Sequence, residues 1–451
     1  MGNTDTKKNI FVVGLDDFNH EILKTVKGAE HYRFHRLMTR QQLQGPDRVP
    51  VDKVLRRCRE KLTQFEGKID AIMGYWDFPV TDIVPLLCRE FNLPSSPFEG
   101  VLKCEHKYWG RLEQQKVVPE VIPAFQPIDP FDESALDKVD LPYPFWIKPI
   151  RATASQMAYK VHNRKQLEKC LLEIRDQIDR FAKPFNYLMG LGNVPAEIAA
   201  IDGRHCLAEG TISGKQCTVE GHVYNGEIHT HGVVDSFRYP GVSSFFRYQY
   251  PSQLPPKIKA QLIDLTTKTI AQTGLDNSTF NVEFFVEKET GNIGLLEVNP
   301  RISQSHSDIF RKVDGASNFD VMVPLALGEK PDFPSREGKY KCAAKFFLRV
   351  FEDTKVLRVP DESEIKQVKK RFPDTHVTIS VKAGDRLSDL SGQDSYSYSI
   401  ANLFIGAKNT QELLQKFRDC RDMLPFNFSN SQLKVAPLRG DKIDLPTRDA
   451  S

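Results

Sequence analysis

Apolar and polar positions follow two recurring patterns along the first hundred residues. Apolar runs that end in glycine stand at 9–14 and 70–74, and their composition is that of β-strands. Residues 83–91 follow with apolar side chains at helical spacing. Because strands that alternate with helices build parallel sheets, the pattern predicts an α/β domain over residues 1–100.

Two strand-like runs with acidic side chains stand just before residue 300. Residues 280–286 and 294–299 have strand composition, and residues 290–292 between them have turn composition. A hairpin that closes around this turn sets Glu283 opposite Glu297, and facing like charges destabilise a sheet. The apolar flanks disfavour a freely solvated hairpin, so a divalent cation between the carboxylates is the simplest explanation.

The second of these strands continues into a polar end. Glu297 and Asn299 are two residues apart, so both side chains point to one face of the strand. Arg301 follows after a proline that breaks the strand. Hard oxygen ligands beside a fixed cation suit magnesium that holds a nucleotide phosphate. We therefore predict Glu283, Glu297 and Asn299 as metal ligands and Arg301 as a catalytic residue.

Lys148 lies inside the apolar run 141–150, which predicts a strand. A lysine is costly to bury there without an anionic partner, so the position indicates a ligand contact. The alternative is an edge-strand lysine whose stem is covered while its ammonium group reaches water.

Asn225-Gly226 predicts a two-residue hairpin turn. On the returning strand, His229 and His231 share one face, and alone they would be half of a metal site. No cysteine and no third histidine stands in a matching register. We therefore expect a half-exposed strand face or substrate-facing side chains.

The last quarter of the chain predicts a separate mixed α/β domain. Residues 328–334 have linker composition. Strand-like runs follow at 341–350, 375–381 and 399–406. Residues 409–423 predict a helix that begins at an Asn/Thr cap. Residues 426–451 are polar and contain proline, and we expect poor order there.

Composition narrows the class of protein. A chain of 451 residues, 40% hydrophobic and 27% charged, is an ordinary globular protein with two or three domains. A net charge of +3 without a long basic run gives no argument for a nucleic-acid partner. No apolar run reaches the length of a membrane span, and the first residues do not form a signal peptide. The 8 scattered cysteines contain no CxxC pair, which predicts reduced thiols and a cytoplasmic location.

Glu283 followed by Glu297-Val-Asn299-Pro-Arg301 resembles the metal-binding end of the ATP-grasp superfamily. That superfamily includes biotin carboxylase, D-alanine–D-alanine ligase and the L-amino acid (dipeptide) ligases. The resemblance covers about residues 9–425. It implies ATP and Mg²⁺ (or Mn²⁺) as cofactors and a three-domain ATP-grasp architecture of α/β class. The implied parts are an N-terminal domain (1–100), a nucleotide-binding region (101–334), a C-terminal domain (335–425) and a tail (426–451).

The resemblance also assigns the ATP contacts. Two lysines would meet the phosphates, a strand edge would bind adenine through its backbone, and polar side chains would reach the rest of the nucleotide. The implied ATP-binding residues are Lys107, Lys148, Ser155, Glu209, Thr211, Ile212, Gln216 and Glu220.

Three positions depart from the family pattern. His106 stands where an aspartate is usual, and Gln216 where a glutamate usually binds the ribose. Residues 151–157 occupy the place of a glycine-rich phosphate loop but contain no glycine, although Arg151 supplies a charge.

Residues after Arg301 correspond to the acceptor pocket of the family. Ser303, Ser305 and His306 offer hydrogen-bond donors and acceptors, which implies a polar substrate, with His306 orienting it or acting as a base. The alternative is a helix start, in which Ser303 or Ser305 caps the helix and His306 lies in its first turn.

The resemblance implies a carboxylate–amine ligase that activates a carboxylate as an acyl phosphate, couples it to an amine, such as that of an amino acid, and releases ADP and phosphate. One alternative is a biotin carboxylase-like enzyme that activates bicarbonate with a separate biotin carrier. Another is a non-catalytic ATP-binding regulatory protein, which the glycine-free residues 151–157 support. The expected partners are a small-molecule carboxylate and an amine, without nucleic acid or membrane. A homodimer is expected only by analogy with relatives, and the identity of both substrates stays open.

Overall fold

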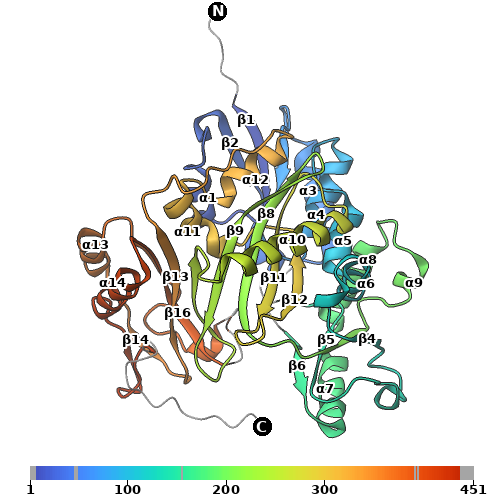
Figure 1. Cartoon of the computed structure of the whole chain (residues 1–451). Helices are drawn as coiled ribbons and strands as arrows, with labels where there is room; N and C mark the ends of the chain where they lie inside the picture. Colours follow the sequence, from blue (N-terminus) through green and yellow to red (C-terminus); the bar gives the residue numbers. More distant parts are fainter. Residues whose placement is uncertain (1–6, 45–48, 154–155, 391–392, 394–395, 437–451) are drawn as a thin grey trace, which may run out of the picture. The chain divides into compact units, whose positions relative to one another are not determined.

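The computed structural model of the chain describes residues 7–44, 49–153, 156–390, 393 and 396–436 (Figure 1). These residues belong to two compact units. The larger unit comprises residues 1–234, 252–307 and 316–335, and the smaller unit residues 235–251, 308–315 and 336–451. The predicted tail lies partly outside the described residues, since its positions 437–451 are not among them.

The larger unit begins with a parallel sheet in the order β2-β1-β3, as the alternating pattern predicted. Its strands are β1 (Lys8–Val13), β2 (Tyr32–Met38) and β3 (Ala71–Met73). Its helices are α1 (Asp17–Leu23), η1 (Ala29–His31), α2 (Arg40–Gln44), α3 (Val51–Thr63) and α4 (Val80–Glu90). Strand β2 was missed at the sequence level, because its charged residues interrupt the apolar pattern.

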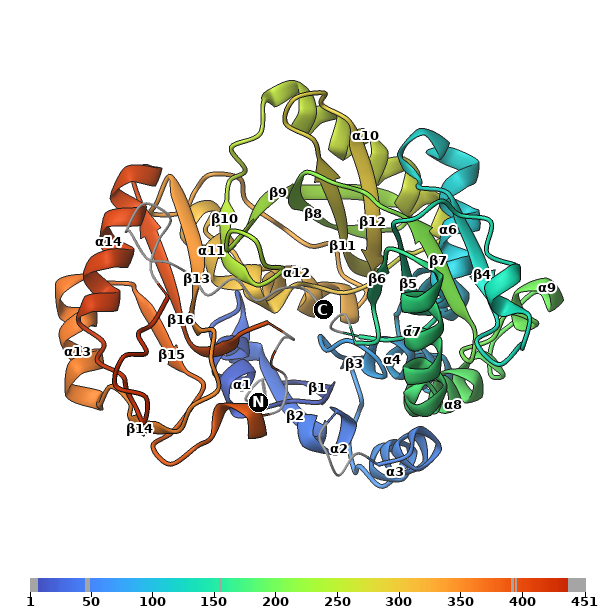
Figure 2. The same ribbon diagram turned by 90° about the horizontal axis from the view of Figure 1, so that it is seen from below.

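A second, antiparallel sheet of the larger unit has the order β4-β7-β5-β6 (Figure 2). Its strands are β4 (Phe125–Ile128), β5 (Phe145–Pro149), β6 (Tyr159–Val161) and β7 (Cys206–Gly210). The surrounding helices are α5 (Phe98–Glu105), α6 (Lys107–Val117), η2 (Pro119–Val121), η3 (Ala135–Asp137), α7 (Arg164–Gln177), α8 (Asp179–Met189) and α9 (Ala196–Ala199). The predicted strand that carries Lys148 is therefore confirmed as β5.

The third sheet of the larger unit has the order β12-β11-β8-β9, with β9 running on into the smaller unit. Its strands are β8 (Lys215–Tyr224), β9 (Glu227–Arg238), β11 (Ser278–Val286) and β12 (Ile293–Asn299). The helices nearby in sequence are α10 (Pro256–Thr273), α11 (Gln304–Asp314) and α12 (Asn318–Ala326). The predicted hairpin turn joins β8 to β9, and its residues Asn225 and Gly226 adopt the left-handed conformation with φ of 50° and 78°.

The smaller unit continues the strand order as β9-β10-β13-β16-β15. Its strands are β10 (Phe245–Tyr250), β13 (Cys342–Val350), β14 (Val356–Arg358), β15 (His376–Ile379), β16 (Tyr398–Ala407) and β17 (Asn427–Phe428), and its further helices are α13 (Glu362–Arg371), η4 (Leu387–Asp389) and α14 (Thr410–Asp422). The core includes the stacked rings of Phe346 and Phe417, whose centroids are 4.3 Å apart. The three predicted strands and the helix capped by Asn409 are all confirmed.

No helix among the described residues is both long enough and apolar enough to cross a bilayer.

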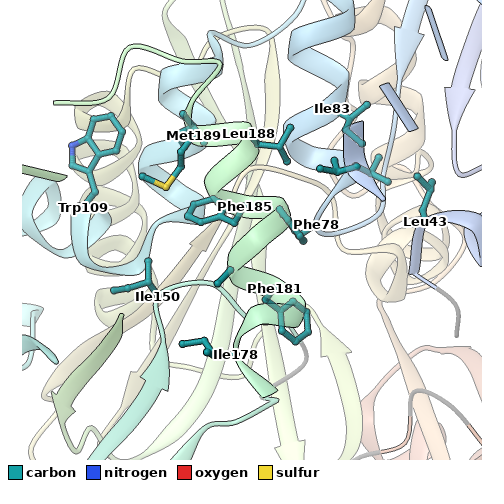
Figure 3. Close-up of a cluster of buried hydrophobic side chains, with 14 of the residues drawn as sticks. Leu43, Phe78, Ile83, Trp109, Ile150, Ile178, Phe181, Phe185, Leu188 and Met189 are labelled. Atoms are coloured by element: carbon teal, nitrogen blue, oxygen red, sulfur yellow. The ribbon is translucent and has the colours of Figure 1, made fainter. Parts of the chain in front are cut away.

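One hydrophobic core joins the first two sheets of the larger unit through their helices. The ring of Phe185 in α8 is fully buried and lies edge to face with Phe78, at a centroid distance of 6.0 Å (Figure 3). Ile83 of α4 and Trp109 of α6 belong to the same cluster. Residues on both sides of the predicted domain boundary at residue 100 contribute to this core.

We predict that Phe185→Ala lowers the free energy of unfolding by about 3–5 kcal/mol, because removing the buried ring leaves a cavity in the core. The matched control is Leu172→Ala on α7, where the side chain is 57% exposed and the expected change is within about 0.5 kcal/mol. Urea unfolding followed by tryptophan fluorescence measures both. Equal losses in the two variants would contradict the assignment of Phe185 to the core.

Candidate functional site

The strand pair β11–β12 sets Glu283 directly opposite Glu297, as the sequence predicted. Both side chains are half-buried. The amide of Gln216 donates to Oε2 of Glu283 over 2.6 Å, from a diagonal position on β8. Gln216, predicted to bind ribose, therefore contacts the first of the two carboxylates.

The facing carboxylates provide a test of the implied magnesium ion. Among the residues that the structure describes, no group of three or more His, Cys, Asp or Glu side chains is arranged to hold a metal on its own. Two carboxylates and the Asn299 amide are instead a partial set of hard oxygen donors, the kind of site in which Mg²⁺ keeps several waters and phosphate oxygens. The residues present thus fit a cation that is shared with a nucleotide phosphate.

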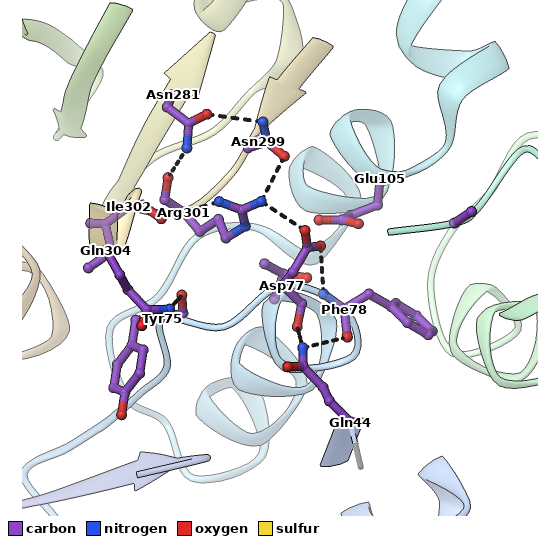
Figure 4. Close-up of polar contacts among 12 residues, drawn as sticks. Gln44, Tyr75, Asp77, Phe78, Glu105, Asn281, Asn299, Arg301, Ile302 and Gln304 are labelled. Atoms are coloured by element: carbon purple, nitrogen blue, oxygen red, sulfur yellow. Dashed lines mark hydrogen bonds and ion pairs between the residues drawn. The ribbon is translucent and has the colours of Figure 1, made fainter. Parts of the chain in front are cut away.

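The end of β12 is held by a pair of asparagines (Figure 4). Asn299 donates to Oδ1 of Asn281 over 3.0 Å, and Asn281 in turn donates to the carbonyl of Arg301 over 2.9 Å. Arg301 donates through Nη2 to Oδ1 of Asn299 over 3.2 Å. Asn281 was missed at the sequence level, although it shares the face of Glu283 on β11 and is paired in register with Asn299.

Asp77, in the segment after β3, binds two arginines with one carboxylate. Its Oδ2 accepts from Nη2 of Arg301 and its Oδ1 from Nη2 of Arg151, each over 2.8 Å. Burial opposes ionisation, but the two guanidinium groups outweigh it and hold the pKa of Asp77 well below its usual range. Arg151 also forms an ion pair with the buried Glu105. Asp77 was missed, and the available signal was an acidic residue just beyond the carboxyl end of a parallel strand.

The anionic partner of Lys148 is a carboxylate of the protein itself. Its ammonium group pairs with Oε2 of Glu209, while Nε of Arg111 donates to Oε1 of Glu209 over 2.5 Å. All three side chains are at most 14% exposed. Burial favours the neutral acid, but Arg111 and Lys148 lower the pKa of Glu209 to about 2. Glu209, predicted at the adenine hinge, therefore carries a structural ion-pair cluster through its side chain.

Arg111 connects this cluster to the strand that carries Glu297. Its Nη2 donates to the carbonyl of Leu296, the residue before Glu297, over 2.6 Å, and its Nη1 donates to Gln114 over 2.6 Å. Arg111 was missed at the sequence level, because an arginine on an amphipathic helix is ordinarily a solvated residue.

Lys107 stands at the first position of α6, close to other cations. Its ammonium group donates to the carbonyl of Ala152 over 3.2 Å. Burial lowers the pKa of Lys107 to about 8, with repulsion from Arg151 and Lys148 and partial compensation from Glu297. Positive charges held this close in a buried setting favour an anion such as a nucleotide phosphate.

His106, which stands where the family has an aspartate, caps α6. Its Nδ1 accepts from the backbone N–H of Trp109 over 3.1 Å, and its Nε2 lies 2.8 Å from the carbonyl of Ile201. These two partners fix the tautomer with the proton on Nε2. Burial lowers the pKa of His106 to about 4, so the ring is neutral at pH 7. The residue holds the helix start that presents Lys107.

The segment between β7 and β8 contains the other predicted hinge residues. Thr211 donates through its hydroxyl to the carbonyl of Pro144 over 2.9 Å, and Ile212 lies against Gly294 of β12. A side chain at Gly294 would come within 2.8 Å of Ile212. Ser155, predicted to contact phosphate, lies outside the described residues.

Glu220 and His306, predicted for the nucleotide and the acceptor respectively, lie in one buried network. Nδ1 of His306 is 2.5 Å from Oε1 of Glu220, and Asn318 donates to Oε2 of Glu220 over 3.1 Å. Asn318 also donates to the carbonyl of Ser303 over 2.9 Å. His306 is only 3% exposed and lies in the first turn of α11, as the helix-start alternative expected. Ser305 lies beside it in the same turn.

The two histidines of β9, His229 and His231, lie beside a third histidine. Nδ1 of His222 on β8 is 2.9 Å from Nε2 of His231, and the His222 ring stacks on His229 at 4.9 Å. Our expectation that no third histidine stands in a matching register was wrong, because pairing between strands brings His222 across. Burial lowers the pKa of His222 to about 4 and that of His231 well below its usual value. Phe333 stacks on His231 at 4.0 Å, so the cluster is a packed stack of rings.

Part of the chain matches a known protein family. Residues 141–308 match the model of the ATP-grasp domain family. A carbamoyl phosphate synthase large chain from Arthrobacter sp. (strain FB24) is 31% identical over 100 residues, which are 22% of this chain and 9% of that protein. A D-alanine–D-alanine ligase from Treponema denticola is 31% identical over 187 residues, 40% of this chain and 44% of that protein. The chain thus spans less than half the length of these curated relatives.

The structure of an L-amino acid ligase from Bacillus licheniformis is similar over almost the whole chain. Its TM-score is 0.72 at 18% sequence identity, covering 94% of this chain and 99% of that one. This likeness establishes the fold, and the family match establishes the domain. The chain therefore contains an ATP-grasp domain and has the ATP-grasp fold, which confirms the predicted fold class.

The ion-pair cluster around Glu209 makes a testable contribution to stability. A carboxylate with a lowered folded-state pKa stabilises the protein above its unfolded pKa, and this stabilisation is lost as the pH falls through the folded pKa. We predict that Glu209→Gln lowers the free energy of unfolding at pH 7 by about 3–5 kcal/mol, since it leaves two buried cations without their anion. The difference from the wild type should shrink as the pH falls below 4.5, the ordinary pKa of a glutamate, towards about 2, the pKa of Glu209 in the folded protein.

Urea unfolding at pH 7 and at pH 3 measures this difference. Glu197→Gln on α9 is the control, because Glu197 is exposed and its loss should change little at either pH. A Glu209→Gln deficit that is the same at both pH values would contradict the assigned ion pairs.

Proposed function

We propose that this chain is an ATP- and magnesium-dependent carboxylate–amine ligase whose substrates include amino acids. The observation that carries the proposal is the register of β11 and β12, which sets Glu283 opposite Glu297 and is followed by Asn299 and Arg301. The likeness to an L-amino acid ligase over the whole fold supports the choice of amino acids.

Under this proposal the residues of the site divide into two groups of opposite charge. Glu283, Glu297 and Asn299 would hold Mg²⁺, and Lys107 and Lys148 would neutralise the phosphates. Bound Mg-ATP supplies an electrophilic phosphoryl group that turns a carboxylate oxygen into part of a leaving group. Ser155, Thr211, Ile212, Gln216 and Glu220 remain our candidates for further nucleotide contacts.

The reaction then needs two bond exchanges. A substrate carboxylate oxygen forms a bond to the γ-phosphorus while the bond to ADP breaks, which gives an acyl phosphate. The amine nitrogen forms a bond to the carbonyl carbon and loses a proton, and phosphate leaves with the electrons of the C–O bond. The chain contributes position and charge to both exchanges: the lysines hold the phosphates, and the Arg301 guanidinium stabilises the negative carbonyl oxygen of the second.

The acceptor side is assigned to the residues after Arg301. Ser303 and Ser305 would bind the polar groups of the acceptor, and His306 would act within its buried pair with Glu220. A homodimer and a cytoplasmic location remain predictions from the sequence.

The test is phosphate release from Mg-ATP across a panel of amino acids and small carboxylates, with the amide product identified by mass spectrometry. We expect release that requires a particular acid–amine pair. Glu297→Ala should lower this release at least about 100-fold, because it removes one of the facing carboxylates. The control is Glu289→Ala, an exposed residue in the turn of the same hairpin, which should retain the activity.

Tight ATP binding without phosphate release for any pair would contradict the ligase proposal for that panel. It would favour the alternative that the chain is a regulatory ATP-binding protein. Equal activity in Glu297→Ala and Glu289→Ala would instead remove Glu297 from the site.

A further inference from the structure

Asp77 is an acid of the site that the sequence did not suggest, and it contacts the predicted catalytic arginine. Its two oxygens are each 2.8 Å from a guanidinium nitrogen, one on Arg301 and one on Arg151 (Figure 4). A carboxylate shared in this way fixes the separation and the orientation of both guanidinium groups. The arginines come from opposite ends of the ATP-grasp domain sequence, residues 151 and 301.

Asp77 is itself held rigidly. Its Oδ1 accepts from the backbone N–H of Phe78 over 2.7 Å, and the amide of Gln44 donates to the carbonyls of Asp77 and Phe78, each over 3.0 Å. Gln304, which follows Arg301 by three residues, donates to the carbonyl of Tyr75 over 3.2 Å. The segment 75–78 is therefore anchored from both sides, so its carboxylate is a fixed point.

The hydrogen bonds of Arg301 are distributed unevenly over its nitrogens. Nη2 donates to Asp77 and Asn299, and Nη1 donates to the carbonyl of Ile302 over 3.3 Å. Nε is buried and has no hydrogen-bond partner among the described residues, and the same holds for Nε of Arg151. A buried guanidinium N–H without an acceptor is costly unless a ligand oxygen completes it.

Charge explains why one carboxylate serves two arginines. Arg151 is 5% exposed and is also paired with the buried Glu105. Burial raises the pKa of Glu105 and of the neighbouring Asp82, whereas the two guanidinium groups lower the pKa of Asp77, so Asp77 is the acid of this group that most favours its charged form. Removing Asp77 would leave an excess of positive charge between Arg151 and Arg301. Such a space has the size and the charge to accept a small carboxylate in place of the missing side chain.

We propose that Asp77 is a positioning residue whose fixed carboxylate orients Arg301 and Arg151. In this orientation Arg301 presents its Nε donor to an anionic oxygen of the substrate. This inference rests on the proposed ligase function and adds a residue to it. Asp77 does not touch the reacting atoms, and its effect on the reaction is carried by Arg301.

The experiment replaces the carboxylate and then returns it from solution. In Asp77→Ala we expect kcat to fall about 100-fold while KM for ATP changes less than about threefold, because the loss falls on an oxyanion donor. Sodium formate at tens of millimolar should restore kcat at least tenfold, and sodium chloride at equal ionic strength should not. Asp77→Asn, which keeps an acceptor for Phe78 but lacks the charge, should be impaired without responding to formate.

Thermal unfolding gives a readout that does not depend on catalysis. Formate should raise the Tm of Asp77→Ala but not that of the wild type, whose anion site already contains Asp77. The matched control is Asp17→Asn on α1, which removes a surface aspartate that pairs with Arg36. It should retain full activity and show no response to formate.

The outcomes separate the two proposals. Full activity of Asp77→Ala, or a loss that formate does not reverse together with a Tm that formate does not raise, would overturn the role of Asp77. Absence of ligase activity in the wild type would overturn the proposed function instead. The formate-dependent change in Tm would then decide alone whether Arg151 and Arg301 form an anion site around Asp77.

Discussion

Two carboxylates that face each other across a sheet are the constraint on which the candidate site depends. Glu283 and Glu297 are paired in register, so their side chains lie next to each other on the same face of the sheet. The groups around them offset this repulsion in part. Gln216 donates to Glu283, and the nearby Lys107 attracts Glu297. The remaining excess of negative charge is what makes a divalent cation an appropriate partner for this end of the sheet.

The cations of the site are not equivalent, and their partners explain why. Lys148 is neutralised by Glu209, and Arg151 by Asp77 and Glu105, so these two are fixed by the protein itself. Lys107 donates to a backbone carbonyl instead of a carboxylate, and burial lowers its pKa. Lys107 would therefore gain the most from the approach of a phosphate. The paired residues provide the rigid frame around it.

The sequence predicted those parts of the site that lie on one strand or on two strands joined by a short turn. The facing of Glu283 and Glu297 follows from a period of two residues and a turn signal, and so does the position of Asn299. Asp77 and Arg111 escaped prediction because their partners lie far away in the sequence, on Arg301 and Glu209 respectively. A carboxylate after a strand and an arginine on a helix are common in solvated positions, and only tertiary packing distinguishes the buried ones.

These contacts also change how the absence of glycine from residues 151–157 is interpreted. A glycine-rich loop binds phosphate through backbone N–H groups and needs freedom of the backbone to do so. Here the segment begins with Arg151, a side chain that is held by Asp77 and Glu105 and whose Nε is left for a ligand. A charge fixed in this way does not require a flexible backbone. The missing glycines are therefore compatible with a site that binds anions through fixed side chains, and they do not by themselves separate an enzyme from a regulatory protein.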